Sequence, residues 1–194
     1  MDKITLYGFA PSTYTRTARM AAHEKGVAAD LMPIAYGKPE HLALHPFGKM
    51  PAMRHGDVTL FETLAIVSYV DDTFPGPALI PNDAVPRAET LSAVSVALDY
   101  AYRPVVHTRT DGDAFDADDL AAADRVLDWL ERRIADTGHA AAGAFTAADL
   151  FFAPMVDYHR GKTGENMTLG KRPNLGRWFK AMSERPSFAA TKAA

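Results

Sequence analysis

The stretch from His45 to Tyr69 places the tightest constraints on how this chain can fold. Pro51 cannot donate a hydrogen bond to a strand ladder, so it marks either a strand edge or a special turn, with a cis peptide bond as one option. Two short runs of strand-forming residues then flank the turn sequence His55-Gly56-Asp57. This pattern predicts a β-hairpin directly after the proline.

A helix follows the hairpin without a break. Glu62 and Thr63 precede the apolar run from Leu64 to Val70. They therefore lie where a helix begins, beside its free N–H groups and the positive end of its dipole. Such a position can hold an anion. The stretch thus predicts an anion-binding helix start next to a special proline turn.

Composition narrows the class of protein. The 194 residues are 47% hydrophobic and 23% charged, which is enough to build a full core in one large or two small domains. The formal net charge of −3 argues against a nucleic-acid partner held through phosphate contacts. The absence of cysteine excludes disulfides and thiolate metal sites, and the seven histidines show no metal-ligand spacing, so we expect no metal. With no apolar run of membrane-spanning length and a strand-like first segment, we expect a cytoplasmic protein with no membrane partner.

Upstream of the proline turn, strand and helix signals alternate. Ile4–Tyr7 predicts a first strand, and Ser12 is a natural N-cap for a helix that Gly26 ends. Ala29–Ile34 predicts a second strand, parallel to the first. A short helix is expected over Lys38–Leu44. Together with the hairpin and its helix, the predicted order is βαβαββα.

A change of composition divides the chain. Four prolines lie close together, at positions 75, 77, 81 and 86, which predicts a linker over residues 76–85 between an α/β domain of residues 1–75 and a second domain of residues 86–194. Beyond the linker the signals are almost entirely helical, so we expect an all-helical bundle. Its expected helices cover residues 87–109, 116–135, a stretch that begins at the capping-box pattern 146–149, and 174–185.

Four short motifs occur in order along the chain. They are Leu6-Tyr-Gly with Ser12 and Arg16 downstream, His45-Pro-Phe-Gly-Lys-Met-Pro51, Leu60-Phe-Glu-Thr-Leu-Ala-Ile-Val-Ser-Tyr69 and Phe145-Thr-Ala-Ala-Asp149. Together they resemble the cytosolic glutathione transferases over nearly the whole chain. The opening segment is most similar to serine-type members, the plant phi class and its bacterial relatives. Three residues depart from the family pattern: His45, Met50 and Thr63 stand where Asn, Val and Ser are usual.

The resemblance implies a thioredoxin-like N-terminal domain and an enzyme that activates the thiol of glutathione, its co-substrate. The thiolate would attack a hydrophobic electrophilic small molecule or reduce a peroxide. Ser12 is implied as the hydrogen-bond partner of the thiolate, with Tyr14 as the rival if the loop register differs. Lowering a thiol pKa by two units needs roughly 2.7 kcal/mol, which a hydroxyl at a helix start can supply. From the residues alone, Ser12 is only an N-cap.

Family analogy also implies where glutathione binds. The backbone before the proline would pair with the cysteinyl part, the helix start after the hairpin would hold the γ-glutamyl end, and two lysines would meet the glycyl carboxylate. The implied contacts are Met50, Pro51, Glu62, Thr63, Lys49 and Lys38. A non-catalytic protein of the same fold, which binds glutathione as a ligand or stress-response protein, is the alternative.

Aromatic residues supply the remaining candidates. Phe9, Tyr102 and His107 are candidates for the electrophile pocket, although a stripe of this kind is more often core or solvated surface. Phe47 lies four residues before Pro51, where several classes of the family insert an aromatic key into a partner subunit. We therefore expect a two-fold homodimer in which Phe47 docks against the partner's fourth or fifth helix. Burial of Phe47 beneath its own hairpin is the alternative.

Overall fold

The computed structural model describes residues 3–111 and 114–192, and the chain divides into two compact units. The first unit is Met1–Leu79 together with Arg185–Ala194, and the second is Ile80–Glu184. The end of the chain therefore packs with the first unit, although in sequence it follows the helical segments.

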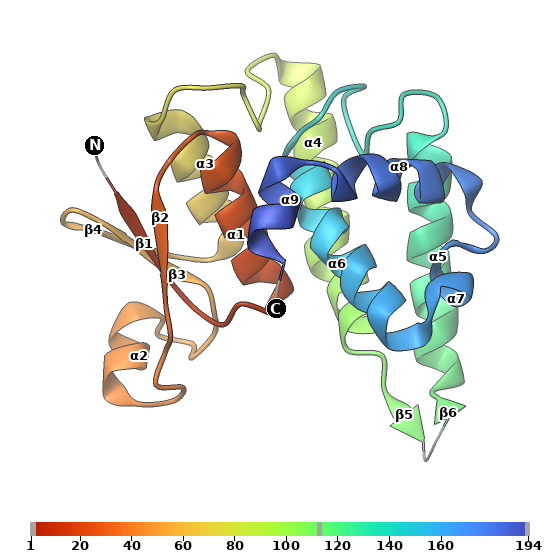
Figure 1. Ribbon diagram of the computed structural model, residues 1–194, viewed down its shortest axis with the longest axis horizontal. Helices are drawn as coiled ribbons and strands as arrows, with labels where there is room; N and C mark the ends of the chain where they lie inside the picture. The colour runs from red at the N-terminus through yellow and green to blue at the C-terminus, as the bar shows by residue number, and fades with distance from the viewer. Residues whose placement is uncertain (1–2, 112–113, 193–194) are drawn as a thin grey trace. The chain divides into compact units, whose positions relative to one another are not determined.

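The first unit is a four-stranded sheet with helices. Its elements are β1 (Ile4–Tyr7), α1 (Thr13–Glu24), β2 (Ala29–Met32), α2 (Pro39–Leu44), β3 (Ala52–His55), β4 (Val58–Phe61), α3 (Thr63–Thr73) and α9 (Pro186–Thr191). The strand order is β2-β1-β3-β4, with β1 and β2 parallel and the other two pairings antiparallel. The predicted order βαβαββα is confirmed up to residue 73, and α9 adds to it (Figure 1).

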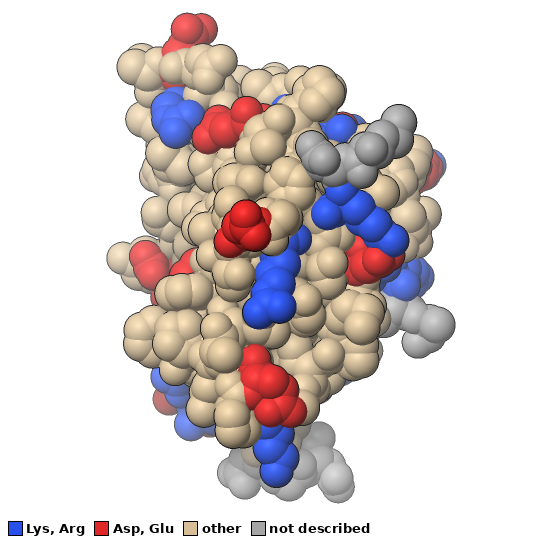
Figure 2. All heavy atoms as spheres, turned by 90° about the vertical axis from the view of Figure 1, so that its left-hand side faces the viewer, with Lys and Arg blue, Asp and Glu red and all other residues tan. Residues whose placement is uncertain are grey.

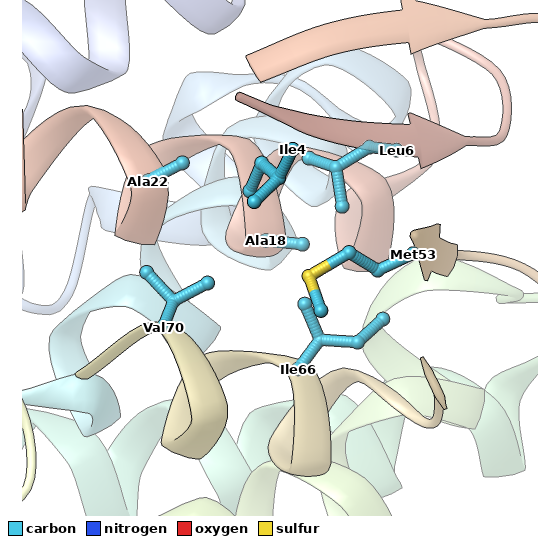
Figure 3. Close-up of a cluster of buried hydrophobic side chains, with 7 residues drawn as sticks. All are labelled: Ile4, Leu6, Ala18, Ala22, Met53, Ile66 and Val70. Atoms are coloured by element: carbon cyan, nitrogen blue, oxygen red, sulfur yellow. The ribbon is translucent and has the colours of Figure 1, made fainter. Parts of the chain in front are cut away.

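The core of this unit lies between one face of the sheet and the helices α1 and α3 (Figure 3). Side chains alternate along β1, so that every second one is buried against the helices. The cluster consists of Ile4, Leu6, Ala18, Ala22, Met53, Ile66 and Val70. Full burial of each larger side chain of this kind contributes about 1.5–3 kcal/mol, so the cluster fixes α1 and α3 against the strands that precede them.

Both ends of α1 follow the sequence signals. Ser12 caps the helix, and Gly26 takes a positive φ of 66° just after it ends. At the start, Gly8 is required for a different reason. A Cβ on Gly8 would lie 2.5 Å from the Oγ1 atom of Thr15, so only glycine lets β1 turn this closely over the first turn of α1.

The helix α9 is fastened to α1 by polar contacts. The Arg185 guanidinium donates to both carboxylate oxygens of Glu24, at 2.9 and 2.7 Å, and the Ser187 hydroxyl donates to the same carboxylate. One turn further along, the Arg16 guanidinium lies 4.6 Å from the centre of the Phe188 ring. These contacts explain why the last described residues belong to the first unit.

The second unit is helical apart from one short pair of strands. Its elements are α4 (Ala84–Val96), the π-helical segment η1 (Ala97–Val106), β5 (Thr110–Asp111), β6 (Ala114–Phe115), α5 (Ala117–Ile134), α6 (Ala147–Thr163), α7 (Glu165–Leu169) and α8 (Pro173–Ser183). The first ten residues of α6 are all buried, and this helix contacts α4, η1, α7 and α8. It is therefore the central helix of the bundle. In the described parts of the chain, no helix combines the length and apolarity that crossing a bilayer requires.

Three expectations about elements were wrong in detail. β2 ends at Met32 rather than Ile34, because Pro33 has no N–H to donate to the ladder. The helix expected over residues 87–109 is two segments, and the second, η1, widens to π-helical pairing around Pro104. The pair β5–β6 follows in a region where the sequence showed almost no strand signal.

Candidate functional site

Four residues lie in register across one end of the sheet. Met32 pairs with Tyr7, Tyr7 with Ala52, and Ala52 with Phe61. Each is the terminal residue of its strand at this end. The segments that leave or enter the strands here must therefore lie along a single edge, which we call the site edge.

The predicted glutathione contacts all belong to segments that meet the site edge. The loop after β1 leads to Ser12, the segment before β3 holds Lys49, Met50 and Pro51, and the residues after β4 are Glu62 and Thr63; Lys38 ends the segment that follows β2. The sheet register thus brings the strand ends that adjoin these segments to one edge, although the segments are far apart in sequence. The predicted cis peptide bond between Met50 and Pro51 is confirmed.

Ser12 occupies the start of α1 with its hydroxyl turned toward the helix. Its Oγ accepts a hydrogen bond from the Thr15 N–H at 3.3 Å. Because a hydroxyl can accept and donate at once, this cap leaves the Ser12 O–H proton available to another acceptor. Tyr14 lies two residues further along, as the second residue of α1, whereas Ser12 precedes the helix with an extended backbone.

The start of α3 is built differently. Glu62 is its N-cap residue, with a positive φ of 70° and a side chain that makes no capping hydrogen bond to the described chain. Its carboxylate is 65% exposed. Thr63, the first helical residue, is 4% exposed. The first N–H groups of α3 therefore have no side-chain cap from residues 3–111 or 114–192, and the unusual backbone at Glu62 costs of order 1–3 kcal/mol.

His41 ties the two lysine segments to α2. Its ring is buried, its Nδ1 accepts from the Gly37 N–H at 3.0 Å, and its Nε2 donates to the Lys49 carbonyl oxygen at 2.9 Å. This arrangement requires the neutral ring with its proton on Nε2. It fixes the backbone on either side of α2, while the Lys38 and Lys49 side chains stay exposed. The sequence reasoning missed His41.

His45 lies beneath the start of α3. Its ring is 2% exposed and stacks against Phe61 with ring centres 4.9 Å apart. Its Nε2 is 3.8 Å from a carboxylate oxygen of Glu62. Burial lowers the pKa of His45, the positive charge of Lys49 adds to this effect, and the Glu62 carboxylate and the backbone of His45 itself oppose it. The sequence showed His45 only as a departure from the family pattern, although its i,i+4 spacing from His41 placed both rings on one helix face.

The remaining candidates are distributed over both units. Phe47 is 72% exposed and touches His45 and Phe61 only edge-on, so it is not buried beneath its own hairpin. Phe9 belongs to the first unit and is partly exposed. Tyr102 and His107 belong to the second, where the Tyr102 hydroxyl and the His107 Nε2 are 3.0 Å apart.

One face of the molecule carries charges of both signs. On the face of the molecule seen in Figure 2, acidic and basic side chains are interspersed among uncharged atoms that form most of the surface. An anion at the site edge would therefore be held by particular N–H groups and side chains. Within residues 3–111 and 114–192, no group of three His, Asp or Glu side chains is placed to hold a metal ion.

Comparison with known proteins identifies the family. Residues 6–78 match the model of the glutathione S-transferase N-terminal domain, and residues 93–186 match that of the C-terminal domain. Similar proteins include glutathione S-transferase F6 of Arabidopsis thaliana, 26% identical with 96% of this chain and 98% of the relative covered, and glutathione S-transferase 4 of Zea mays, 29% identical with 98% and 92% covered.

Solved structures agree with these matches. Glutathione transferase F7 of Populus trichocarpa superimposes with a TM-score of 0.85 at 28% identity, covering 97% of both chains. A glutathione S-transferase of Methylobacillus flagellatus, solved with glutathione bound, gives a TM-score of 0.85 at 25% identity, covering 99% of this chain and all of that one. The two family models together take in most of the sequence, and the relatives match it from end to end. This chain belongs to the glutathione S-transferase family.

Proposed function

We propose that this protein holds glutathione along the site edge and uses Ser12 to stabilise its thiolate for attack on a hydrophobic electrophile. The protein is an enzyme of the glutathione S-transferase type, as its curated relatives are over the whole chain. The observation that carries the assignment is the geometry of Ser12. Its Oγ caps α1 with a lone pair, and its O–H proton is left to donate toward a sulfur at the positive end of the helix.

The dimensions of the site edge support a tripeptide. Strands lie about 4.8 Å apart, so a row of four spans about 14 Å, and an extended tripeptide is roughly 10 Å long. We assign the γ-glutamyl end to Glu62 and Thr63, with the substrate carboxylate at the uncapped N–H groups of α3 and the ammonium at the Glu62 carboxylate. Met50 lies directly before Pro51, and Ala52, which follows Pro51, is the first paired residue of β3.

The other end of the tripeptide follows from this orientation. We assign the cysteinyl backbone to Met50, whose own backbone lies outside the described ladder, and the glycyl carboxylate to the exposed Lys49 and Lys38. For the electrophile, Phe9 and the Tyr102–His107 pair stay the candidates. The thiol of free glutathione resembles a cysteine thiol, so ionisation near pH 7 requires its pKa to fall by about two units.

The function can be tested directly on the unmodified protein. The ultraviolet absorbance of the thiolate, followed against pH, should show that bound glutathione ionises about two pH units below free glutathione. Steady-state assays with aryl halides, isothiocyanates and hydroperoxides should show turnover with at least one of these classes. Tight binding of glutathione with an unshifted thiol pKa and no turnover would instead identify a ligand-binding protein.

We also propose that the protein is a cytoplasmic, two-fold homodimer with Phe47 as the docking residue. Reduced glutathione is maintained in the cytosol, which is where the reaction needs it. An aromatic side chain that is 72% exposed in the single chain is suited to a pocket on a second copy, against the partner's fourth or fifth helix. A buried aromatic anchor contributes on the order of 2 kcal/mol or more, and two-fold symmetry applies it twice.

Sedimentation velocity at micromolar concentration tests the dimer. Phe47→Ser should shift the protein toward monomer, whereas Val58→Ser, which removes another exposed apolar side chain of the same unit, should leave the sedimentation coefficient unchanged. An unmodified protein that sediments as a monomer would contradict the dimer. A Phe47→Ser dimer of undiminished affinity would contradict only the role of Phe47.

A further inference from the structure

The buried imidazole of His45 has a role that the proposed contacts do not explain. His45 follows the last residue of α2, where its N–H donates to the His41 carbonyl oxygen and its own carbonyl oxygen accepts from the Gly48 N–H. Its ring is enclosed by Phe61 and by the edge of Phe47. Backbone and ring contacts together fix the direction in which each ring nitrogen points.

The two nitrogens of His45 have different surroundings. Nδ1 is buried and has no hydrogen-bond partner in the described part of the chain. Nε2 is 3.8 Å from the Oε1 atom of Glu62. A neutral imidazole carries one proton; on Nδ1 it would be buried with no well-formed hydrogen bond to another residue of the described chain, whereas on Nε2 it faces the Glu62 carboxylate. The neutral ring is therefore expected to carry its proton on Nε2, directed at Glu62.

The Glu62 carboxylate has little else to orient it. It does not cap α3, it is mostly exposed, and among the described residues His45 is the one basic side chain within 4.0 Å of it. The unusual φ of Glu62 sets the direction in which its side chain leaves the backbone. The His45 ring then lies where it can select one position of the carboxylate.

We propose that His45 is a positioning residue that orients Glu62 toward the ammonium group of glutathione and makes glutathione affinity pH-dependent. This inference rests on the proposed function. Neutral His45 directs a polar N–H at Glu62 and leaves the full negative charge of the carboxylate for the ammonium. Protonated His45 places a positive charge beside the same carboxylate and competes with the ammonium for it.

The charged groups around the ring determine where this change occurs. The Glu62 carboxylate at the start of α3 and the backbone of His45 itself favour the protonated form, whereas Lys49 before the proline turn opposes it. His41 on α2 is neutral in its hydrogen-bonded form and opposes protonation of His45 only when it is itself protonated. Burial and these groups together keep the pKa of His45 below its ordinary value of about 6.5. The affinity for glutathione should therefore be constant above neutral pH. It should fall as the pH is lowered below about 6.5, the ordinary pKa of a histidine.

The first experiment measures binding of S-methylglutathione by calorimetry between about pH 8 and about pH 5. This probe has no ionisable thiol, so its affinity does not report thiolate formation. The unmodified protein should bind it about tenfold more weakly at the acid end, which corresponds to one unit of linked pKa change. His45→Asn keeps an N–H donor but cannot be protonated, so its affinity should vary much less. His23→Asn, at an exposed histidine of α1, should behave like the unmodified protein.

The second experiment needs no ligand. The ring protons of His45, assigned by their loss in His45→Asn, are titrated by NMR in the free protein and in Glu62→Gln. Removing the carboxylate should lower the pKa of His45, whereas it should leave that of His23 unchanged.

The outcomes distinguish the positioning role of His45 from the proposed glutathione site itself. An unchanged His45 titration in Glu62→Gln, or equal pH dependence in His45→Asn and the unmodified protein, would overturn the positioning role even if glutathione binds. Failure of S-methylglutathione to bind at any pH, with the His45–Glu62 coupling present, would overturn the proposed glutathione site and the role of His45 in it.

Discussion

The helix starts of the two units differ in what occupies them. In the second unit, α5 begins with its own carboxylates: Asp116 caps the Asp119 N–H at 2.9 Å, and Asp118 and Asp119 lie in the first turn. In the first unit, neither α1 nor α3 has an acidic residue in its first turn. A carboxylate in the first turn contributes typically 0.3–1 kcal/mol, and α1 and α3 lack this contribution. The N-cap residue of α3, Glu62, carries a carboxylate, but its side chain makes no capping hydrogen bond and is 65% exposed.

This difference indicates which helix starts serve folding and which can serve a ligand. The start of α5 is already neutralised by the chain, so an external anion gains little there. The starts of α1 and α3 meet the same sheet edge and hold no carboxylate in their first turns, so the proposed function assigns them to an anion from outside the chain. Each of the following predictions tests whether the distinction holds.

The largest effect is expected at the start of α1. Ser12→Ala removes the donor to the thiolate, so turnover near neutral pH should fall about 100-fold and the pKa of bound glutathione should rise by about two units. Loss of the cap should lower the free energy of unfolding by only about 1 kcal/mol. Enzyme assays, thiolate absorbance and urea unfolding measure the three quantities. If Tyr14→Phe abolishes activity and Ser12→Ala does not, Tyr14 is the partner of the thiolate.

A smaller effect is expected at the start of α3. Glu62→Ala and Thr63→Ala should each weaken glutathione binding by about 1–3 kcal/mol, the range for losing a hydrogen bond to a charged group. The thiol pKa of glutathione that still binds should change little, because Ser12 is untouched. Calorimetry gives the affinities. Unchanged affinity in both variants would remove α3 from the site.

The next prediction concerns a carboxylate added to the first turn of α3. Ala65 is exposed in the first turn of α3, so Ala65→Glu supplies the first-turn carboxylate that this helix lacks. The free energy of unfolding should rise by about 0.3–1 kcal/mol, while glutathione affinity should fall several-fold through repulsion of its carboxylate. The matched change in the second unit is Asp118→Ala, which should lower stability by a similar amount without affecting affinity. Equal glutathione affinity before and after Ala65→Glu would contradict the comparison.

The smallest effect concerns the occupied start of α5. Hydrogen bonds from Arg109 hold the pKa of Asp119 at about 2. A carboxyl whose pKa is depressed in the folded state contributes stability above its unfolded pKa of about 3.9, and that contribution is lost as the pH falls through about 2. Asp119→Asn should therefore reduce the acid dependence of urea unfolding between about pH 4 and pH 2. Glutathione binding at neutral pH should be unaffected.

The sequence was most informative where local chemistry decides the structure. The caps of α1, the hairpin and the helix after Glu62 follow from single residues with few alternatives, and the structure confirms these elements. The last part of the chain was predicted less well. The helix expected over residues 174–185 ends at Ser183, and Pro186 begins a further helix, α9, at a position where its missing N–H costs nothing.

The residues of the candidate site also differ in whether the sequence alone could predict them. The segments that carry Ser12, Pro51 and Glu62 could be named from sequence because each has a local signature. The contact between His45 and Glu62 could not, since it joins residues 17 positions apart through the packing of two aromatic rings. Packing of this kind has no periodicity in sequence, so only the folded structure brings it out.

The attachment of α9 to α1 has a consequence for synthesis of the chain. Translation produces β1 to α3 early, yet Arg185, which binds Glu24, and Phe188, which lies against Arg16, emerge only after the whole second unit. Domains generally fold in the order in which they leave the ribosome. Here the surface of α1 that α9 covers stays open throughout that interval, so the unit that starts first is completed last.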